Sequence, residues 1–283
     1  MQDLSGKTAV VTGAASGMGL AFADRFARAG MNVVMSDIEA PRLDEAVAAV
    51  AEHGTGVIAQ ITDVSDGDSV DELAARTLGE FGLVHVVCNN AGVAGNLRGG
   101  REQLSAAEWK WVLDVNLWGV IHGHRVFLPH LIEQGEGHIV NTASMAGHLP
   151  GHSAYTASKW AVVGITQGLF HQMQMEATGV GVSCLCPGFV STEIHNSERN
   201  RPEAAAPQAL AEPTPEDEMR LAFMTEMVTS GKPPAEVADL VHDAIVDDRF
   251  WIFTDLAMVQ VLADKHASIM ENRNPANPMP PGS

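Results

Sequence analysis

Cysteine is scarce in this 283-residue sequence, and that scarcity excludes several kinds of site. The three cysteines, Cys88, Cys184 and Cys186, show no CxxC spacing, so neither a disulfide framework nor a zinc-binding pattern is present. All three lie in apolar runs typical of strands, and we expect buried, inert thiols and no metal site. Aromatic residues make up only 5% of the chain, so the core must consist mainly of Ala, Val, Ile, Leu and Met.

Basic residues are also few in this sequence. Lys and Arg number 17 against 35 Asp and Glu, and the formal net charge is −18. Nucleic acid and anionic membranes both require a basic surface, so neither is expected as a partner. No uncharged apolar run reaches the roughly 18 residues of a membrane span, and residues 1–7 lack the apolar stretch of a signal peptide. We expect a soluble, cytoplasmic protein.

Short β-branched runs alternate with longer helical patterns, which predicts βαβ units and a parallel sheet. Apolar residues are nearly continuous in the runs 9–11 and 84–87, as in strands covered on both faces. The predicted fold class is therefore α/β, a doubly wound parallel sheet with helices on both faces. The expected strands are residues 7–12, 32–36, 57–62, 84–89, 138–143, 181–186 and 250–253. The expected helices are residues 18–29, 40–53, 66–81, 108–128, 153–177 and 234–247.

No internal boundary or repeat interrupts this alternation, so we predict a single domain over residues 1–271. Residues 191–234 are rich in Pro, Ala and Glu and too long for an ordinary connection. Their apolar side chains at helical spacing in 219–228 can cover a pocket, and we expect a substrate lid. The alternative is a helix packed on the body beside a loose surface loop. Residues 272–283 are expected to form a disordered tail.

A glycine-rich turn follows the first expected strand, where residues 12–19 read TGAASGMG with a GxxxGxG spacing. Glycine permits a tight turn and the close approach of a ligand. The helix that follows offers free N–H groups and a positive dipole end, which suit a pyrophosphate. Such a triplet alone can be an ordinary strand-to-helix turn, but its place between a strand and a helix favours dinucleotide binding.

Asp37 ends the second expected strand, 18 residues after Gly19. A carboxylate at that place can accept hydrogen bonds from an adenosine ribose and repel a 2′-phosphate. Neither the next residue, Ile38, nor Ser16 in the glycine-rich turn supplies a positive charge, so NAD is favoured over NADP. The alternative role for Asp37 is that of a helix N-cap or a turn residue.

In their order along the chain, these and further motifs resemble the short-chain dehydrogenase/reductase family in its single-domain form. The resemblance implies a Rossmann-like, seven-stranded sheet in the order 3-2-1-4-5-6-7, with the substrate over the carboxyl ends of the strands. One departure is that Ser144 and Tyr155 lie only 11 residues apart, which predicts a shortened loop over 145–154. The motifs are TGxxxGxG at residues 12–19, Asp37, Asp63-Val64, Asn89-Asn90-Ala91-Gly92, Asn116, Ser144, Tyr155 with Lys159, and Pro187-Gly188 with Thr192.

The resemblance also implies which residues bind NAD. Asp63 and Val64 hold the adenine, Asn90 packs beside the adenosine and stabilises the centre of the sheet, and Lys159 holds the nicotinamide ribose. The segment 187–192 positions the carboxamide. The predicted cofactor set is Gly13, Ser16, Gly17, Met18, Gly19, Asp37, Asp63, Val64, Asn90, Tyr155, Lys159, Pro187, Gly188, Val190 and Thr192.

The predicted catalytic residues are Asn116, Ser144, Tyr155 and Lys159. Tyr155 is the only tyrosine in the chain, and its ordinary pKa of about 10 makes it a poor base at neutral pH. Lys159 follows one helical turn later, and its ammonium, together with a positive nicotinamide ring, should lower that pKa. Ser144 would hold the substrate oxygen, and Asn116 would hold a water joined to Lys159.

Substrate contacts are predicted only from neighbourhood to these motifs. They are Met145, His152 and Phe189. His148 is expected to be a solvated loop residue. His122 and His124 are expected at the surface or at an interface, because residues two apart on a helix do not face each other and cannot form a metal pair.

The predicted function is an NAD-dependent alcohol dehydrogenase or carbonyl reductase that interconverts a secondary alcohol and a ketone or aldehyde, with a mainly apolar small-molecule substrate. The resemblance further implies a homodimer or homotetramer. Two alternatives stay open: a dehydratase- or epimerase-type enzyme that uses NAD on the same fold, and a catalytically silent NAD-binding regulator. The complete catalytic set speaks against the silent protein, and the single-domain length speaks against the larger epimerases.

Overall fold

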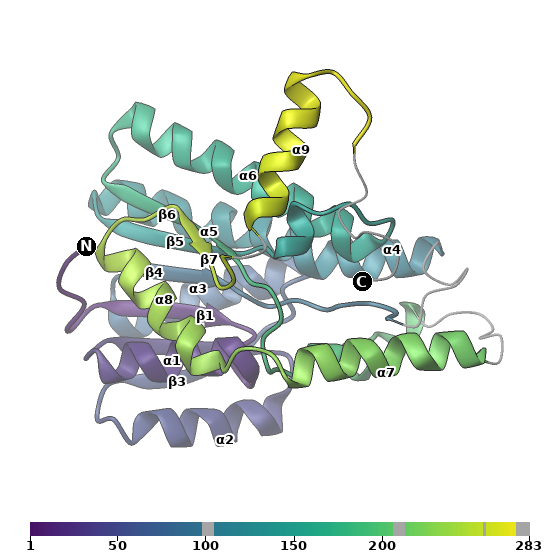
Figure 1. Ribbon diagram of the computed structural model, residues 1–283. Helices are drawn as coiled ribbons and strands as arrows, with labels where there is room; N and C mark the ends of the chain where they lie inside the picture. Colours follow the sequence, from purple (N-terminus) through teal and green to yellow (C-terminus); the bar gives the residue numbers. More distant parts are fainter. Residues whose placement is uncertain (98–104, 206–212, 257–258, 276–283) are drawn as a thin grey trace.

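A seven-stranded parallel sheet forms the centre of the computed structural model, which describes residues 1–97, 105–205, 213–256 and 259–275 (Figure 1). The strand order is β3-β2-β1-β4-β5-β6-β7, which confirms both the predicted fold class and the predicted order. The strands are β1 (Thr8–Thr12), β2 (Asn32–Asp37), β3 (Val57–Ile61), β4 (Val86–Asn89), β5 (Gly137–Thr142), β6 (Val180–Cys186) and β7 (Trp251–Phe253).

The strand order places a crevice at the carboxyl edge of the sheet. β1 pairs with β2 on one side and with β4 on the other. The chain moves outward from β1 to β3 and then returns to β4, so the connections on the two sides run in opposite directions. Loops after neighbouring strands diverge at such a switch point, and ligands of open α/β sheets bind there.

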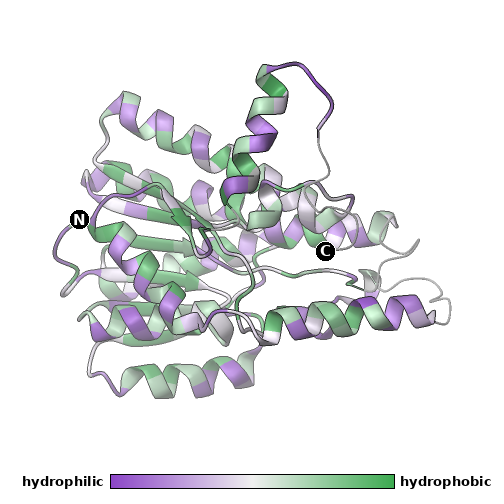
Figure 2. Ribbon diagram, in the orientation of Figure 1, coloured by the Kyte–Doolittle hydropathy of each residue, from purple (hydrophilic) through white to green (hydrophobic). Residues whose placement is uncertain are grey.

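Helices cover both faces of this sheet, as predicted. Apolar residues concentrate in the strands and on the helix faces turned toward them, and hydrophilic residues lie outside (Figure 2). Alternate residues of β1 serve the two faces: Ala9 and Val11 contact one layer, and Val10 contacts the other. The first layer comprises α1 (Gly17–Arg28), α2 (Ala40–Ala51) and α8 (Pro234–Val246), and the second comprises α3 (Gly67–Phe81), α5 (Gly119–Gln134) and α6 (Ala154–Glu176).

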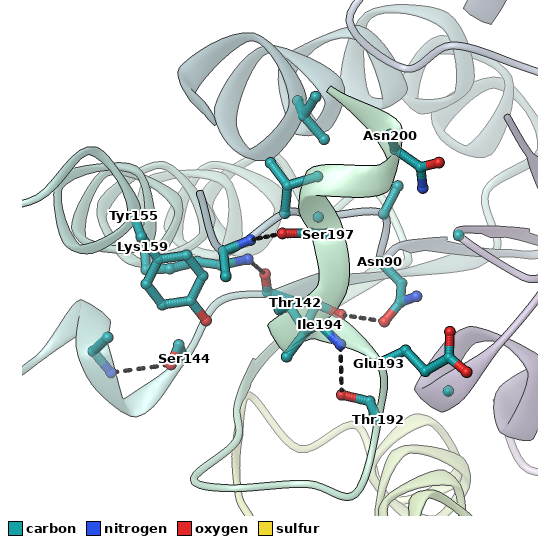
Figure 3. Close-up of a pocket in the computed structure, with 18 of the residues that line it drawn as sticks. Asn90, Thr142, Ser144, Tyr155, Lys159, Thr192, Glu193, Ile194, Ser197 and Asn200 are labelled. Carbon is teal, nitrogen blue, oxygen red and sulfur yellow. Dashed lines mark hydrogen bonds between the residues drawn. The ribbon is translucent and has the colours of Figure 1, made fainter. Parts of the chain in front are cut away.

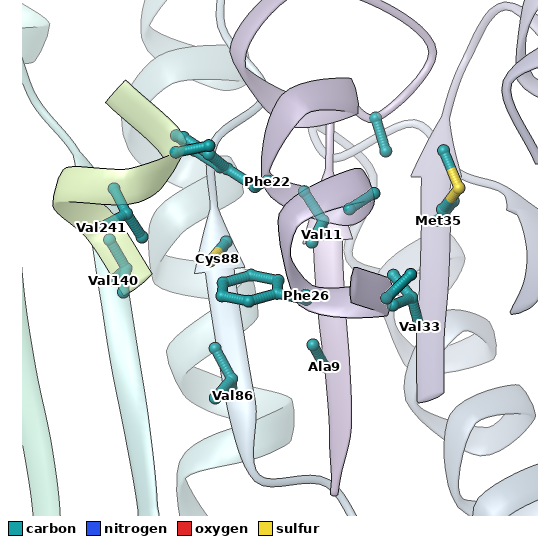
Figure 4. Packing of buried hydrophobic residues seen from close by; sticks show 14 of the residues in the cluster. Ala9, Val11, Phe22, Phe26, Val33, Met35, Val86, Cys88, Val140 and Val241 are labelled. Atoms are coloured by element: carbon teal, nitrogen blue, oxygen red, sulfur yellow. The ribbon is translucent and has the colours of Figure 1, made fainter. Parts of the chain in front are cut away.

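The packing of α1 fixes the position of the glycine-rich turn. Phe22 and Phe26 lie one helical turn apart and are completely buried against the sheet (Figure 4). A fully buried side chain of this kind contributes roughly 1.5–3 kcal/mol through apolar burial. Because both rings hold the helix down on β1, the first turn of α1 stands directly over the carboxyl end of that strand.

The predicted helix over residues 108–128 is wrong in its continuity. The structure has α4 (Ala106–Leu113), a π-helical turn η2 (Asp114–Trp118) and then α5. A π turn inserts an extra residue and shifts the helical register, and such turns are frequent at functional sites. Here the turn contains Asn116, whose side chain is hydrogen-bonded to the backbone of Val93 instead of lying on the outer helix surface.

The expected lid segment, 191–234, is only partly described, because residues 206–212 lie outside the described residues. The described part contains η4 (Ile194–Asn200), η5 (Glu203–Ala205) and α7 (Pro215–Thr229), and α7 confirms the predicted helical stretch. α9 (Gln260–Met270) follows β7 near the end of the described residues. The last eight residues, 276–283, also lie outside the described residues, so the disordered tail and the lid stay predictions. No described helix has the length and apolar character that a membrane crossing requires.

Candidate active site

A cavity of about 680 Å³ opens at the carboxyl edge of the sheet, within the usual size range of small-molecule pockets. The loops that follow six consecutive strands of the sheet all contribute to its lining. The residues at these strand ends are Asp63 after β3, Asp37 of β2, Gly13 after β1, Asn90 after β4, Ser144 after β5 and Pro187 after β6. The cavity thus coincides with the crevice that the strand order predicts.

The glycine-rich turn after β1 approaches its neighbours too closely for side chains. Gly13 and Gly17 have φ values of +67° and +55°, a conformation that favours glycine. A Cβ on Gly13 would lie 2.9 Å from the Cα of Ala91, and a Cβ on Gly19 would overlap the carbonyl oxygen of Gly13. Ser16 makes no side-chain hydrogen bond to the start of α1, so the N–H groups there are open to an anion.

Asp37 is a turn residue in the structure, and its contact with a ribose stays a prediction. Its Oδ2 accepts a hydrogen bond from the backbone N–H of Ala15 at 2.9 Å, and its Oδ1 accepts one from Glu39 at 3.0 Å. The carboxylate therefore stabilises both the glycine-rich turn and the turn after β2. It also lines the cavity, and each oxygen keeps a lone pair for a ligand.

Asn90 connects the ends of three strands beneath the cavity. Its Nδ2 donates to the carbonyl oxygen of Thr12 at 2.9 Å, and its Oδ1 accepts from the hydroxyl of Thr142 at 3.2 Å (Figure 3). Asp63 and Val64 line the cavity after β3. The Asp63 carboxylate is held by the hydroxyl of Ser65 at 2.6 Å. These residues give the cavity a rigid wall on the side of β1 to β3.

Tyr155, Lys159 and Ser144 meet at the opposite end of the cavity (Figure 3). α6 begins at Ser153, whose hydroxyl accepts from the N–H of Thr156, and this cap fixes where Tyr155 emerges. The Tyr155 hydroxyl is hydrogen-bonded to Ser144. Lys159 lies one turn later, with its Nζ 5.7 Å from the centre of the tyrosine ring.

The expected lowering of the Tyr155 pKa does not occur in the protein alone. Burial raises the pKa of Tyr155, and the hydrogen bond from Ser144 opposes that rise only in part. Lys159 donates to the carbonyl oxygen of Thr142 at 2.8 Å, so its ammonium is not directed at the phenol. Burial also lowers the pKa of Lys159 to about 8. The sequence reasoning had counted the charge of Lys159 but not the burial of both groups.

Asn116 is completely buried beside this set. Its Nδ2 donates to the carbonyl oxygen of Val93 at 2.9 Å and to the hydroxyl of Ser158 at 3.1 Å, and its Oδ1 accepts from the N–H of Val93 at 2.8 Å. The side chain thereby fixes the loop after β4 to α6. The water that we expected between Asn116 and Lys159 stays a prediction.

The substrate contacts predicted from the sequence are placed unequally. Met145 and Phe189 line the cavity, but His152 is exposed and does not line it. Sequence reasoning missed most of the apolar wall. Leu149 and Pro150 lie in the short loop between Ser144 and Tyr155 and were within reach of that argument. Val93 directly follows the motif at 89–92, and Leu97, Trp111 and Val115 come from segments without a motif. Met224 and Val228 also line the cavity, and both belong to the helical stretch 219–228 that was expected to cover a pocket.

Two histidine predictions are wrong. His148 is half-buried, with its ring 5.5 Å from that of Trp251 and its Nε2 3.4 Å from the Sγ of Cys186. His124 is turned inward, and its Nε2 lies 3.2 Å from the Oδ1 of Asn141. Burial lowers the pKa of both rings. Within the described ranges no cluster of three or more His, Cys, Asp or Glu side chains suits a metal ion.

Comparison with known proteins agrees with this arrangement. The family described as short chain dehydrogenase matches residues 7–203. The chain is 37% identical over 265 residues to 1-deoxy-11-beta-hydroxypentalenate dehydrogenase of Streptomyces avermitilis, covering 93% of this chain and 89% of that protein. It is 31% identical to the CLA biosynthesis dehydrogenase/reductase of Lactiplantibacillus plantarum, covering 97% of both. Among solved structures, a short chain dehydrogenase/reductase from Burkholderia phymatum in complex with NAD is 42% identical, with a TM-score of 0.93 over 99% of both chains.

Proposed function

The chain belongs to the short-chain dehydrogenase family of oxidoreductases, and from this premise we propose that it interconverts a secondary alcohol and a ketone with NAD and uses Tyr155 as the acid/base. The observation that carries the proposal is the meeting of Tyr155, Ser144 and Lys159 at one end of the cavity, opposite the glycine-rich turn. A proton-transfer group and an oxygen-binding group thus face the same space.

The residues around the cavity fit NAD. A side chain at Gly13 or Gly19 would clash with the backbone of Ala91 or Gly13 and displace the turn that a pyrophosphate would contact. Asp37 presents a carboxylate to a ribose. Two arginines lie near this end, which by itself would favour a 2′-phosphate. However, Arg42 is paired with Glu193 at 2.8 Å, and Arg199 is paired with Glu39 at 2.7 Å. Their charge is already compensated, which supports NAD over NADP.

Each catalytic side chain has a distinct task in the proposed oxidation. Tyr155 takes the proton of the substrate hydroxyl, and Ser144 donates a hydrogen bond to the substrate oxygen. NAD, when bound, supplies the acceptor for the hydride that leaves the carbinol carbon. Lys159 holds the nicotinamide ribose and favours the phenolate of Tyr155 once a second positive charge is beside it. Burial raises the pKa of Tyr155 in the protein alone, so we propose that the phenol becomes a base only in the complex with NAD.

The substrate end of the cavity favours an apolar alcohol. Its lining includes Val93, Trp111, Met145, Leu149 and Phe189. Such a wall binds by burial of apolar surface and offers few hydrogen bonds outside the reacting oxygen. We therefore propose a bulky, mainly apolar secondary alcohol as the substrate. The expected homodimer or homotetramer stays a separate prediction, which light scattering at micromolar concentration tests.

The proposal is tested with a panel of secondary alcohols, comprising steroid, alicyclic, aryl and short-chain members, in the presence of NAD. We expect NADH to form fastest with bulky apolar alcohols, and NADP to be a poor substitute. NAD binding should be measured in parallel by quenching of tryptophan fluorescence. Tight NAD binding with no NADH from any alcohol would favour the silent NAD-binding protein, and weak NAD binding would contradict both alternatives.

A further inference from the structure

Residues 193–201, here called the strap, cross the mouth of the cavity after β6. Ile194, Ser197 and Asn200 line the cavity. The short helix η4 that carries them lies between Asn90 on one side and Tyr155 and Lys159 on the other (Figure 3). The hydroxyl of Ser197 accepts from the backbone N–H of Ala94 at 3.0 Å, so the middle of the strap is bonded to the loop after β4.

One anchor of the strap lies beside β2, at the end that carries Asp37. The carboxylate of Glu39 accepts from Nη2 of Arg199 at 2.7 Å and from Nδ2 of Asn200 at 2.6 Å. Glu193, at the start of the strap, accepts from Arg42 at 2.8 Å. The exposed fractions of the Arg199 and Glu39 side chains are 26% and 18%. This anchor is therefore a partly solvated network at the cofactor end of the cavity.

The other anchor lies on α4, at the apolar end, and is much more deeply buried. Arg201 donates to Glu108 at 2.5 Å, and each of these side chains is only 7% exposed. The Arg201 guanidinium also stacks 4.2 Å from the centre of the Trp111 ring. Glu108 accepts a further hydrogen bond from the N–H of Asn96 at 2.7 Å. One ion pair thus joins the strap, α4 and the loop after β4.

These three segments supply one side of the wall that faces the substrate. Val93 and Asn96 come from the loop, Trp111 comes from α4 and Ser197 comes from the strap. An ion pair withdrawn from water is costly unless the two partners hold a well-defined geometry. Glu108 and Arg201 are in hydrogen-bond contact, and the Arg201 guanidinium also stacks on Trp111. The pair lies where the strap, α4 and the loop after β4 meet.

We infer that the strap has two anchors with separable roles: Glu39 positions it over the cofactor end, and the Glu108–Arg201 pair sets the shape of the substrate end and thereby the specificity of the enzyme. Glu108 and Arg201 are positioning residues, since they act through the wall that they assemble. The inference rests on the proposed function, because the two ends are named for NAD and an apolar alcohol.

The test compares Glu108→Gln with Glu39→Gln, two matched losses of a carboxylate charge at the two anchors. Glu108→Gln keeps an acceptor for Asn96 but removes the buried counter-ion of Arg201, which then keeps only the more exposed Glu198. We expect it to raise KM for bulky apolar alcohols about tenfold or more while the Kd for NAD changes by less than about twofold. Glu39→Gln should raise the Kd for NAD about tenfold or more while KM for bulky apolar alcohols changes by less than about twofold. Equal shifts of both constants in both variants would overturn the inference.

Two further measurements guard against a merely unstable variant. The double variant Glu108→Gln/Arg201→Leu leaves no buried unpaired charge, since the one carboxylate that loses its partner, Glu198, is 48% exposed. Its stability should therefore recover while KM stays raised; a return of KM to the wild-type value would refute the positioning role. Hydrogen exchange reports on the strap without any turnover. It should speed up at 93–97 and 197–205 in Glu108→Gln but not in Glu39→Gln, and this outcome stands or falls separately from the alcohol panel.

Discussion

Ser144, Tyr155 and Lys159 at the carboxyl edge of the sheet can be compared with Ser183, His138 and Asp248 nearer the amino edge. Nε2 of His138 lies 2.7 Å from the Ser183 hydroxyl, and its Nδ1 lies 3.9 Å from Asp248, an order of residue types that resembles a hydrolytic triad. The Ser183 hydroxyl, however, donates to the carbonyl oxygen of Arg249 at 2.6 Å and is completely buried.

The comparison shows what separates a reactive group from a structural one. The Tyr155 side chain lines a cavity of about 680 Å³, and the Ser144 hydroxyl is its hydrogen-bond partner. The Ser183 hydroxyl has both its donor and an acceptor position occupied by the protein. Both edges bring a serine hydroxyl to a titratable side chain, so access and unused hydrogen-bonding capacity decide which one performs chemistry.

The largest expected difference between the edges comes from deleting one hydroxyl at each. Tyr155→Phe should lower kcat by about 10²–10⁴-fold, the usual contribution of a general acid or base, with the Kd for NAD almost unchanged. Ser183→Ala should leave kcat within about twofold but reduce the free energy of unfolding by roughly 1–3 kcal/mol, because His138 and the Arg249 carbonyl lose a partner. Turnover at saturating NAD and urea unfolding check both. A Tyr155→Phe variant with more than about a tenth of the wild-type rate would contradict the assignment.

A matched pair of glycines sharpens the same contrast. A Cβ at Gly19 would overlap the Gly13 carbonyl, and a Cβ at Gly181 would overlap the His138 ring. Gly19→Ala should therefore weaken NAD binding by about a hundredfold or more through displacement of the turn, equivalent to roughly 2.7 kcal/mol. Gly181→Ala should lower the melting temperature but leave the Kd for NAD unchanged. Fluorescence titration measures the Kd for NAD, and thermal unfolding measures the melting temperature of each variant. An unaltered Kd in Gly19→Ala would contradict the role of the glycine-rich turn in NAD binding.

The amino edge should also dominate the acid sensitivity of the fold. Burial lowers the pKa of His138 to about 3, against roughly 6.5 for an unfolded chain. The ring is neutral when folded, so its stability contribution is complete above pH 6.5 and is lost as the pH falls toward 3. The loss is about 1.4 kcal/mol per pH unit across that window. His138→Gln should lose stability less steeply between pH 7 and pH 5 in urea titrations, whereas identical slopes in the two proteins would disprove the assignment.

The smallest expected effect comes from removing one carboxylate at each edge, Asp37 or Asp248. Wild-type protein should prefer NAD to NADP in kcat/KM, and Asp37→Ala should narrow that preference by about tenfold, because a negative charge no longer faces the 2′-phosphate. Asp248→Ala removes a carboxylate at the other edge and should leave the preference unchanged. Equal use of both cofactors by the wild-type protein would count against the role of Asp37.

Much of the cofactor end was predictable because its signals are local. The turn over residues 12–19 depends on glycine at positions where the backbone allows nothing larger, and Asp37 follows directly from the end of β2. The strands were found to within about two residues; β4, for example, begins at residue 86 instead of 84. Apolar runs and glycine positions are properties of the sequence itself, so they can be interpreted without knowing which segments pack together.

The substrate end was less predictable because its contacts are not local. His152 is adjacent to the catalytic motif but points to solvent, and His148 packs against Trp251, a residue more than a hundred positions away. The π turn at Asn116 likewise has no periodicity signal, since its side chain is held by Val93 of a remote loop. The raised pKa of Tyr155 depends on burial, which spacing to Lys159 does not reveal.

The sequence by itself determined the α/β sheet, its strand order through the family motifs, the glycine-rich turn and the identity of the single tyrosine. The sheet and the turn follow from apolar periodicity and backbone preference, which act over a few residues, whereas the strand order and the role of the tyrosine follow from the resemblance of the motifs to the family. Only the tertiary structure decided that Glu108 meets Arg201 across 93 positions, that Arg199 is neutralised by Glu39, and that Ser183 is silent while Ser144 faces the cavity. Ion pairing and access depend on distances between segments, and those distances exist only after the sheet has brought the segments together.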